Sequence, residues 1–297
     1  MRKTLLYIAW FALASAPPVS ARSAFFWDME QGTRLSVDYL EFEDSELETQ
    51  PQGNIGGQRS TTALQYDFSG EQGWVLAAGH EYNALDIDVE PDAEPQANGD
   101  LHTLSLATRW LGSMGPGRLQ LAVAPALSLS SNALKDTDSW DSNSLQWWGA
   151  ATYILADDKV NWIVGLARDY RFGDPRAYPV MGLRWSDDLH QVMLTYPDIS
   201  VVRALGESWG LGFTIAPDGN RWQAWDRDLE ASDDFRREAW QSEVFLRYGF
   251  RNGFRLGLAV GYYWSQQWKY HNQSGGVSRI DSEDSGYVGF HLGWRPS

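Results

Sequence analysis

The chain has 297 residues, a formal net charge of −15, no cysteine, and 16 Trp, 13 Tyr and 12 Phe residues. The absence of cysteine excludes disulfides, thiolate metal sites, cysteine nucleophiles and lipidation at an N-terminal cysteine. The acidic balance argues against nucleic acid as a partner, because phosphates need a basic face. Trp and Tyr favour membrane interfaces, so the aromatic content gives the first indication of a membrane protein.

The first residues have the pattern of a secretory signal. Arg2 and Lys3 precede an apolar run from Leu5 to Ala14, and small residues follow, ending at Ala21. This pattern predicts a signal peptide over residues 1–21 and a mature domain over 22–297. The alternative is a retained membrane anchor, but the apolar run is too short to span well. No later stretch approaches the ~18 apolar residues of a transmembrane helix, so we expect strands to cross the membrane.

From about residue 31 onward, segments of roughly ten residues alternate apolar with small or polar side chains. In one of them Leu119, Leu121 and Val123 share a face, with Gln120 and Ala122 opposite. This period predicts strands, because successive side chains of a strand point to opposite faces. We expect about fourteen strands, at 34–43, 60–69, 73–83, 101–110, 118–129, 144–154, 161–171, 178–185, 189–204, 208–216, 220–227, 238–250, 253–265 and 285–294.

The strand count must be even if both termini face the periplasm, and twelve is the alternative. The difference lies in the stretch 189–227, where Pro197-Asp198 either bulges one long strand or turns between two short ones. Proline disrupts a central ladder, so both interpretations stay open. No domain boundary is predicted within 22–297, because a barrel must close on itself to leave no unpaired edge in lipid.

A water-soluble β-sandwich would alternate in the same way, but the connectors favour a barrel. Short connectors at 69–73, 111–117, 156–159, 186–188 and 251–253 alternate with long polar ones at 44–58, 83–99, 130–142 and 266–283. Outer-membrane barrels have short periplasmic turns and long outer loops. Aromatic residues flank the short turns and predict a girdle at one interface, made of Phe68, Trp74, Trp110, Tyr153, Trp162, Trp185, Phe250, Phe254 and Trp294.

The chain resembles the bacterial outer-membrane β-barrel proteins of an uncharacterised family. The resemblance rests on the signal peptide, the hairpin rhythm and the closing strand from Val288 to Trp294, which is similar to the C-terminal signal of such barrels. This strand departs from the usual form, because Arg295-Pro296-Ser297 follow the final aromatic residue. The resemblance implies an outer-membrane location, contact with outer-membrane lipid and lipopolysaccharide, and the barrel-assembly machinery as a partner. It implies no catalytic residue.

Charged side chains in the predicted strands are expected to face the interior, because an arginine on the lipid side costs ~2–4 kcal/mol at the midplane. Small inward residues such as Gly212 and Gly261 favour open space beside them. The sequence therefore predicts a passive or substrate-selective channel for small solutes, with a structural or adhesion barrel and an outer-membrane lipid-modifying enzyme as alternatives. The candidates for lining the lumen are Glu81, Arg109, Arg118, Arg184, Glu243, Arg247 and Arg255.

A catalytic site is not expected. His80 and His102 are predicted on the lipid-facing side near the outer strand ends, and Ser105 lies on the opposite face from His102. A catalytic pair made across strands stays open. His291 is expected to point inward. Acidic clusters at 41–48, 86–94 and 226–234 lack the glycine-turned loop of a calcium hand, so we predict solvated outer loops, with no metal and no cofactor.

Overall fold

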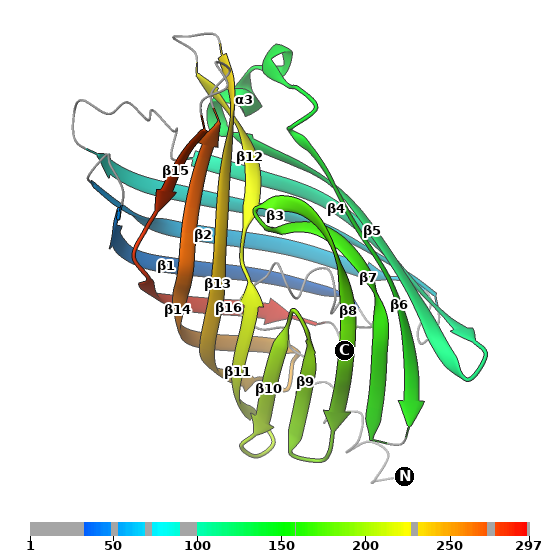
Figure 1. The fold of residues 1–297 in the computed structure, drawn as a ribbon. Helices are drawn as coiled ribbons and strands as arrows, with labels where there is room; N and C mark the ends of the chain where they lie inside the picture. The colour runs from blue at the N-terminus through cyan, green and yellow to red at the C-terminus, as the bar shows by residue number, and fades with distance from the viewer. Residues whose placement is uncertain are drawn as a thin grey trace.

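The computed structural model describes residues 33–48, 53–68, 73–89, 100–157, 159–226, 231–271 and 277–295. The predicted signal peptide, residues 1–21, lies outside the described residues. The described chain forms a closed antiparallel β-barrel, as the alternating pattern predicts (Figure 1). No helix in these ranges is both long enough and apolar enough to cross a membrane.

The strands follow one another in hairpins around the barrel. They are β1 (Arg34–Glu46), β2 (Gly53–Asp67), β3 (Gly73–Val89), β4 (Asp100–Met114), β5 (Gly117–Ser130), β6 (Leu145–Asp157), β7 (Val160–Phe172), β8 (Asp174–Ser186), β9 (His190–Tyr196), β10 (Ile199–Ala204), β11 (Trp209–Pro217), β12 (Asn220–Asp226), β13 (Ala231–Gly249), β14 (Phe254–His271), β15 (Val277–Asp281) and β16 (Ser285–Trp294). The remaining elements are α3 (Ser131–Lys135) and η1 (Thr137–Ser139).

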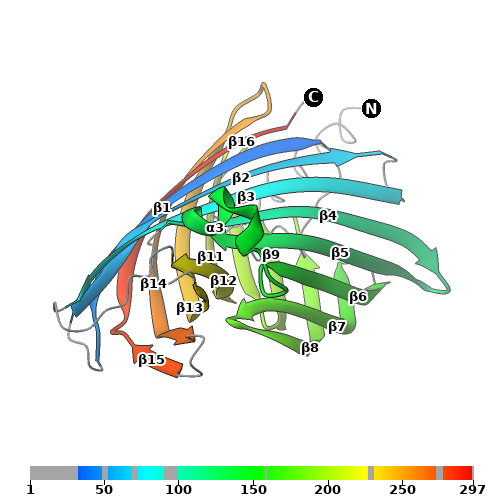
Figure 2. The same ribbon diagram turned by 90° about the horizontal axis from the view of Figure 1, so that it is seen from above.

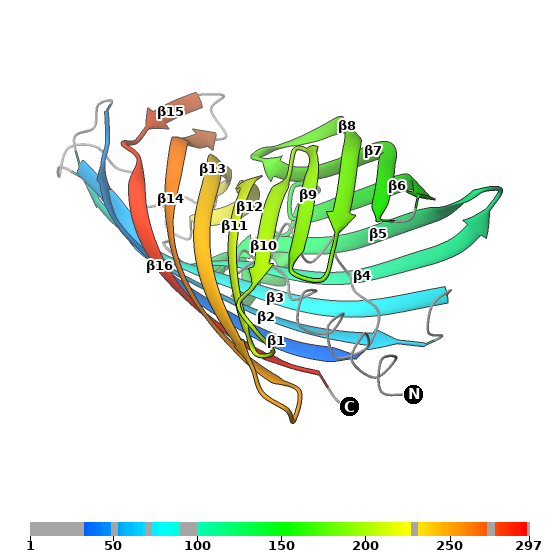
Figure 3. The same ribbon diagram turned by 90° about the horizontal axis from the view of Figure 1, so that it is seen from below.

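The barrel closes where the last strand meets the first. Leu35 of β1 pairs with Trp294 of β16, whose other edge pairs with β14. β12 follows β11 along the same edge of β13, and β15 lies beyond β16 along the same edge of β14. These two strands add no position around the barrel, so the 16 strands described form a wall of 14. In the view from below, β1–β4 pass on one side of the barrel and β8–β11 on the other (Figure 3).

The two faces of the wall differ as the alternation requires. Along β14, Leu258 and Val260 are 63% and 60% exposed on the outer face, whereas Gly257 and Ala259 are buried. Apolar side chains on the outside suit a hydrocarbon environment, and the polar backbone groups are paired within the wall. The outer face is therefore the one expected to meet lipid.

The segment 189–227 differs from the predicted strands in two ways. The single long strand predicted at 189–204 is two strands, β9 and β10, joined by a tight turn at Pro197-Asp198, because Pro197 has no amide hydrogen for the ladder. The strand predicted at 220–227 is β12. It is not a separate strand of the wall, because it follows β11 after Asp218 and pairs with the next part of the same strand, β13. The first departure adds one strand to the wall and the second removes one, so the wall still has fourteen strands.

We call β12 the strap, because it joins two distant parts of the sheet. One edge of the strap pairs with β13, and its other edge meets β5 through a single parallel bridge between Gln223 and Leu129. The Asn220 side-chain amide and the Trp222 indole both donate to the hydroxyl of Thr103 on β4, at 3.0 and 3.1 Å. Seen from above, the strap lies inside the outline of the barrel, next to α3 (Figure 2).

The predicted long loops are partly strand. β1, β2 and β3 run into the stretches 44–58 and 83–99, and β14 and β15 occupy much of 266–283. A tilted strand needs about 9–11 residues to cross a bilayer, and β13 has 19, so strands project beyond the membrane at this end. We call the end that carries α3 the loop end, and the end with the connectors 115–116, 187–189 and 250–253 the turn end.

Candidate functional site

The charged residues predicted to line the lumen all alternate onto the inner face of the wall. Glu81, Arg109, Glu243 and Arg247 are buried there, between 1% and 7% exposed. Arg118 and Arg255 are half-buried, and Arg184 is exposed on the inner face near the turn end. The register therefore places these residues on the inside of the barrel.

A buried charge cluster holds the base of the strap to the opposite wall. Arg59 of β2 donates to both carboxylate oxygens of Asp218 at 2.9 Å and to the hydroxyl of Tyr263 at 2.9 Å. Arg237 of β13 contacts the same carboxylate at 3.2 Å and lies over the Tyr263 ring, 4.1 Å from its centroid. We call Arg59, Asp218, Arg237 and Tyr263 the strap cluster. All four side chains are almost completely buried, so these charges rely on one another for stabilisation.

Aromatic side chains fill the space beyond the strap cluster. Trp222 of the strap and Trp268 of β14 are each 2% exposed and pack on either side of Phe235. The rings of Phe235 and Trp268 are stacked with centroids 5.3 Å apart. Together with the strap cluster, they occupy the interior of the barrel toward the loop end.

A second buried charge cluster joins the tips of two short hairpins. Arg171 donates to Asp169 at 3.0 Å and to Asp198 at 2.7 Å, and its guanidinium also donates to the Tyr178 hydroxyl. Asp198 lies in the β9–β10 turn, whereas the other three residues come from the β7–β8 hairpin. Gly173 at the tip of that hairpin has φ +76° and approaches the backbone of Arg237, where a larger residue would clash. The tip of the β7–β8 hairpin thus lies against β13, and Arg171 joins the β9–β10 turn to this hairpin.

These two clusters contain residues that the sequence pattern did not single out. Arg59 falls at the edge of a predicted loop, and Asp218 falls in a predicted turn. The positions that interact are 159 residues apart in the chain, so no local pattern connects them.

Small inward residues do not leave the open space that the sequence suggested at two positions. The ring of Phe245 lies over Gly212 on the neighbouring strand, and that of Tyr287 lies over Gly261. The Tyr287 hydroxyl donates to Glu243 at 3.1 Å and also contacts Gln241. Glycine is needed here because an added Cβ would lie about 2.1 Å from either ring.

The predicted aromatic residues lie together at the turn end. Phe68, Trp74 and Trp162 are more than half exposed on the outer face, and Phe254 packs beside Trp294 with centroids 6.2 Å apart. The other members are near the same turns: Trp110, Tyr153 and Trp185 lie toward the turn-end ends of β4, β6 and β8, and Phe250 directly follows β13. Such an arrangement is typical of an interfacial girdle.

The histidines divide between the two faces. His291 is buried on the inner face and contacts the Asp38 carboxylate, as its position predicts. His80 and His102 lie on the outer face of β3 and β4 near the loop end, and their ring nitrogens are 3.1 Å apart. His190 contacts Asp187 in a turn-end connector. Within the described ranges, no three histidine or carboxylate side chains converge as a metal site would require.

Comparison with known proteins adds little beyond the fold. No family model and no curated protein matches the chain, so membership of an uncharacterised barrel family stays a prediction. Among solved structures, it is similar to an outer membrane channel from Pseudomonas putida F1 (8% identity, 90% of this chain and 96% of that chain, TM-score 0.45).

Two further solved structures are similar at the same level. They are a bacterial polysaccharide outer membrane secretin (11% identity, 91% of this chain and 100% of that chain, TM-score 0.44) and the translocator domain of the autotransporter NalP from Neisseria meningitidis (12% identity, 93% of both chains, TM-score 0.42). At these TM-scores the likeness carries no argument about function. The barrel rests on the strand pairing of the chain itself.

Proposed function

We propose that the protein is an outer-membrane channel for small solutes, closed at the loop end in the conformation described. The observation that carries the proposal is the contrast between the two faces of the wall. The outer face is apolar, whereas the inner face carries charged and polar side chains from the turn end to the loop end. The inward arginines at the turn end, Arg118, Arg184, Arg247 and Arg255, suit a passage for small charged solutes.

The arrangement favours anions over cations at the turn end. Arg118, Arg184, Arg247 and Arg255 lie on the inner face in this part of the wall. Fixed positive charge in a narrow passage attracts anions more effectively than loop charge repels them, since salt screens charges beyond ~10 Å. We therefore expect anion selectivity despite the acidic loops.

The closure is attributed to the strap and the aromatic residues that pack on it. Trp222, Phe235 and Trp268 fill the interior near the loop end, and the strap cluster anchors the base of the strap. Conduction would require the strap to move away from β4, β5, β6 and the segment between β5 and β6. Its hydrogen bonds to Thr103, Ser130, Ser139 and Gln146 and its bridge to Leu129 would have to break in that movement.

Planar bilayer recording tests the proposal. We expect the purified protein to conduct in brief openings, and Trp222→Ala to increase the open fraction, because the truncated side chain no longer fills the passage. The double substitution Arg247→Gln with Arg255→Gln should reduce the preference for anions. The matched control is Arg203→Gln, since Arg203 is exposed on the outer face at nearly the same height as Arg247. Silent recordings for both the parent protein and Trp222→Ala would contradict the channel.

The membrane location is tested separately. Fractionation is expected to recover the protein with outer membranes, in a form whose gel mobility changes on heating, because a closed barrel resists detergent. Leu258→Arg should block assembly, since Leu258 is 63% exposed at mid-strand on the outer face and an arginine there costs ~2–4 kcal/mol. Leu258→Ala is the control, because it removes the side chain without adding charge. Recovery in the soluble periplasm would contradict the location.

A further inference from the structure

Two histidines and a serine form a hydrogen-bonded row on the outer surface of the barrel, at the loop end. The rings of His80 on β3 and His102 on β4 are nearly parallel, with centroids 5.4 Å apart and Nε2 of His80 3.1 Å from Nδ1 of His102. Nε2 of His102 lies 2.8 Å from the hydroxyl of Ser131, the first residue of α3. These residues come from three separate elements, so the row is made by the tertiary fold.

The position of Ser131 is held by the local structure of α3. The neighbouring Ser130 caps the helix, accepting from the amide of Ala133 at 3.3 Å and from the amide of Trp225 on the strap at 3.2 Å. The Trp140 indole donates to the carbonyl of Ala133 at 2.7 Å. This short helix is therefore attached at both sides, and the Ser131 hydroxyl is kept next to His102.

The order of the atoms allows two directions of hydrogen bonding along the row, and one of them suits catalysis. If Ser131 donates to Nε2 of His102, then Nδ1 of His102 carries its proton and donates to Nε2 of His80. This is the arrangement in which an imidazole acts as general base toward a serine while a third group orients the ring. The third group is the neutral His80 side chain, which is a weaker partner than a carboxylate.

The surroundings of His102 contain further polar groups. The Tyr82 ring lies 5.0 Å from that of His102, and the Tyr82 hydroxyl donates to Asp100 at 2.7 Å. Asp100 and Lys135 lie close enough for their charges to act on the His102 ring. Lys135 is four residues after Ser131 in α3, so both side chains share one side of the helix. A cation at this place would stabilise negative charge that develops beside Ser131.

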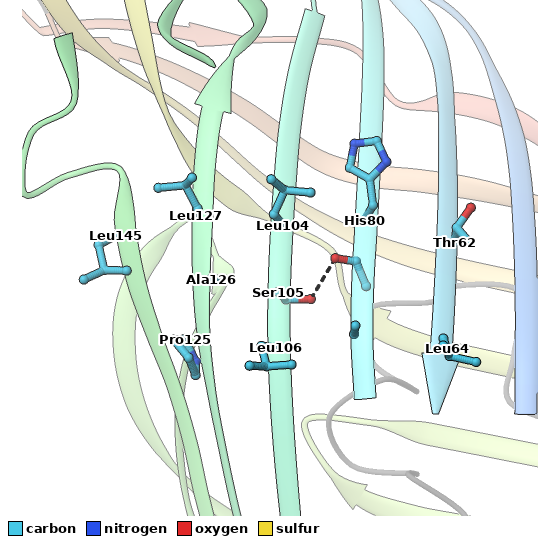
Figure 4. Close-up of a pocket in the computed structure, with 12 residues that line it drawn as sticks. Thr62, Leu64, His80, Leu104, Ser105, Leu106, Pro125, Ala126, Leu127 and Leu145 are labelled. Carbon is cyan, nitrogen blue, oxygen red and sulfur yellow. Dashed lines mark hydrogen bonds between the residues drawn. The ribbon is translucent and has the colours of Figure 1, made fainter. Parts of the chain in front are cut away.

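An apolar groove begins at His80 and runs along the outer face toward mid-membrane (Figure 4). It has a volume of about 620 Å³, and its walls include Leu64, Leu104, Leu106 and Leu145. The groove lies where β4 and β5 do not pair between Ser105 and Thr108, because Pro125 opposite has no amide to donate. On a face that meets lipid, an apolar groove of this kind fits an acyl chain.

We propose that Ser131, His102 and His80 form a hydrolytic site for the ester-linked acyl chains of membrane lipids, with the groove below His80 holding the chain. Ser131 and His102 are the catalytic residues, and His80 is a positioning residue. The site lies on the outer face of the wall and is separate from the passage inside the barrel, so it adds an activity to the proposed channel.

The reaction is an acyl transfer to water. The Ser131 oxygen attacks the ester carbonyl carbon as His102 Nε2 takes the hydroxyl proton, and Lys135 faces the oxyanion that forms. The carbon–oxygen bond to the lipid alcohol breaks, and the alcohol leaves with the proton from His102. Water then attacks the acyl-serine with His102 again as base, which releases the fatty acid and restores the Ser131 hydroxyl. The sum is ester plus water to acid plus alcohol.

The test uses the full-length protein in mixed micelles, with phospholipid in one series and lipid A in the other, and measures released fatty acid. Release from one series identifies the lipid class, and release from both indicates recognition of the ester and acyl chain alone. Ser131→Ala and His102→Ala should lower the rate by ~10³-fold or more, in line with losses seen when a serine or its base is removed. A fluorophosphonate probe should label the parent protein but not Ser131→Ala.

Controls separate chemistry from folding and from conduction. Ser113→Ala and His190→Gln, both at the turn end, should keep the full rate. All variants should retain heat-modifiable gel mobility, and Ser131→Ala should leave bilayer conductance unchanged. His80→Leu should lower kcat by ~10–10²-fold and change its pH profile, whereas His80→Gln, which can still accept from His102, should recover much of the rate. Absence of fatty-acid release from both lipids, or equal rates for the parent and Ser131→Ala, would overturn the proposal.

Discussion

The interior of the barrel is built differently at its two ends. At the loop end, charged and aromatic side chains from distant strands are buried against one another, with Arg59 and Asp218 only 6% and 1% exposed. At the turn end, Arg184 is exposed on the inner face and Arg118, Val202 and Arg255 are half-buried, although Arg247 and His291 are buried there as well. The comparison shows that inward side chains are packed more completely around the strap than at these turn-end positions. A substitution should therefore have unequal effects at the two ends.

The largest difference is expected for aspartate. Asp218→Ala would leave the guanidinium groups of Arg59 and Arg237 buried without their shared carboxylate. Removing one partner of a buried ion pair costs about 3–5 kcal/mol, so the free energy of unfolding should fall by this amount. Denaturant titration of the protein refolded into lipid vesicles measures it. Asp187→Ala in a turn-end connector is the control. Equally small losses of unfolding free energy for both substitutions would contradict the difference between the two ends.

A smaller difference is expected for tryptophan. Trp222→Ala deletes a fully buried ring and its hydrogen bond to Thr103, with an expected cost of about 3 kcal/mol. Trp209→Ala at the turn end removes a ring that is 45% exposed on the outer face, and should cost less. The same vesicle titration compares the two. A larger loss for Trp209→Ala would show that interfacial anchoring outweighs interior packing.

Tyrosine hydroxyls give a finer comparison. Tyr287→Phe leaves the Glu243 carboxylate with one partner fewer in a buried place, so we expect a loss of about 1–3 kcal/mol. Tyr248→Phe at the turn end changes a half-buried ring on the outer face and should be nearly neutral. Thermal gel-shift curves should place Tyr287→Phe below the parent and Tyr248→Phe with it. Coincident curves for all three proteins would contradict the role of this hydroxyl.

The smallest effect is a pH dependence at the turn end. The backbone amides of Leu189 and His190 lower the pKa of the Asp187 carboxyl. A carboxylate with a lowered pKa stabilises the folded state above its ordinary pKa of about 4, and this contribution is lost as the pH falls through the lowered value. Asp187→Asn should therefore flatten a small part of the stability profile below pH ~4. An unchanged profile would mean that these amide contacts do not persist in solution.

Much of the architecture follows from local patterns. The alternation of Leu258 and Val260 with Gly257 and Ala259 predicted both the strand and its outward face, because strand geometry converts sequence spacing directly into facing. The inward direction of His291 was predicted for the same reason. The girdle, predicted from aromatic residues that flank the short turns, stays a prediction. For the stretch 189–227 the sequence left two interpretations open, since Pro197 marks an interruption but does not say whether the chain bulges or turns. The structure shows the turn between β9 and β10.

The candidate sites were much less predictable. The sequence placed His80 and His102 on one outer face, but Ser131 stood in a predicted loop and had no visible connection to either histidine. The same limit applied to Asp218, whose partners Arg59 and Arg237 lie on strands from opposite ends of the chain. Strands that come together only when the barrel closes can hydrogen-bond to one another without a periodic pattern in the sequence of either strand.

The sequence by itself determined that this chain forms the strands of a barrel and which of their faces are apolar. These features depend on single strands, whose period and composition are local properties. Only the tertiary structure decided that β12 becomes a strap across to β5, and that His80, His102 and Ser131 lie in one row. The physical reason is that closure and strand register bring together groups whose separation along the chain carries no information about their distance in space.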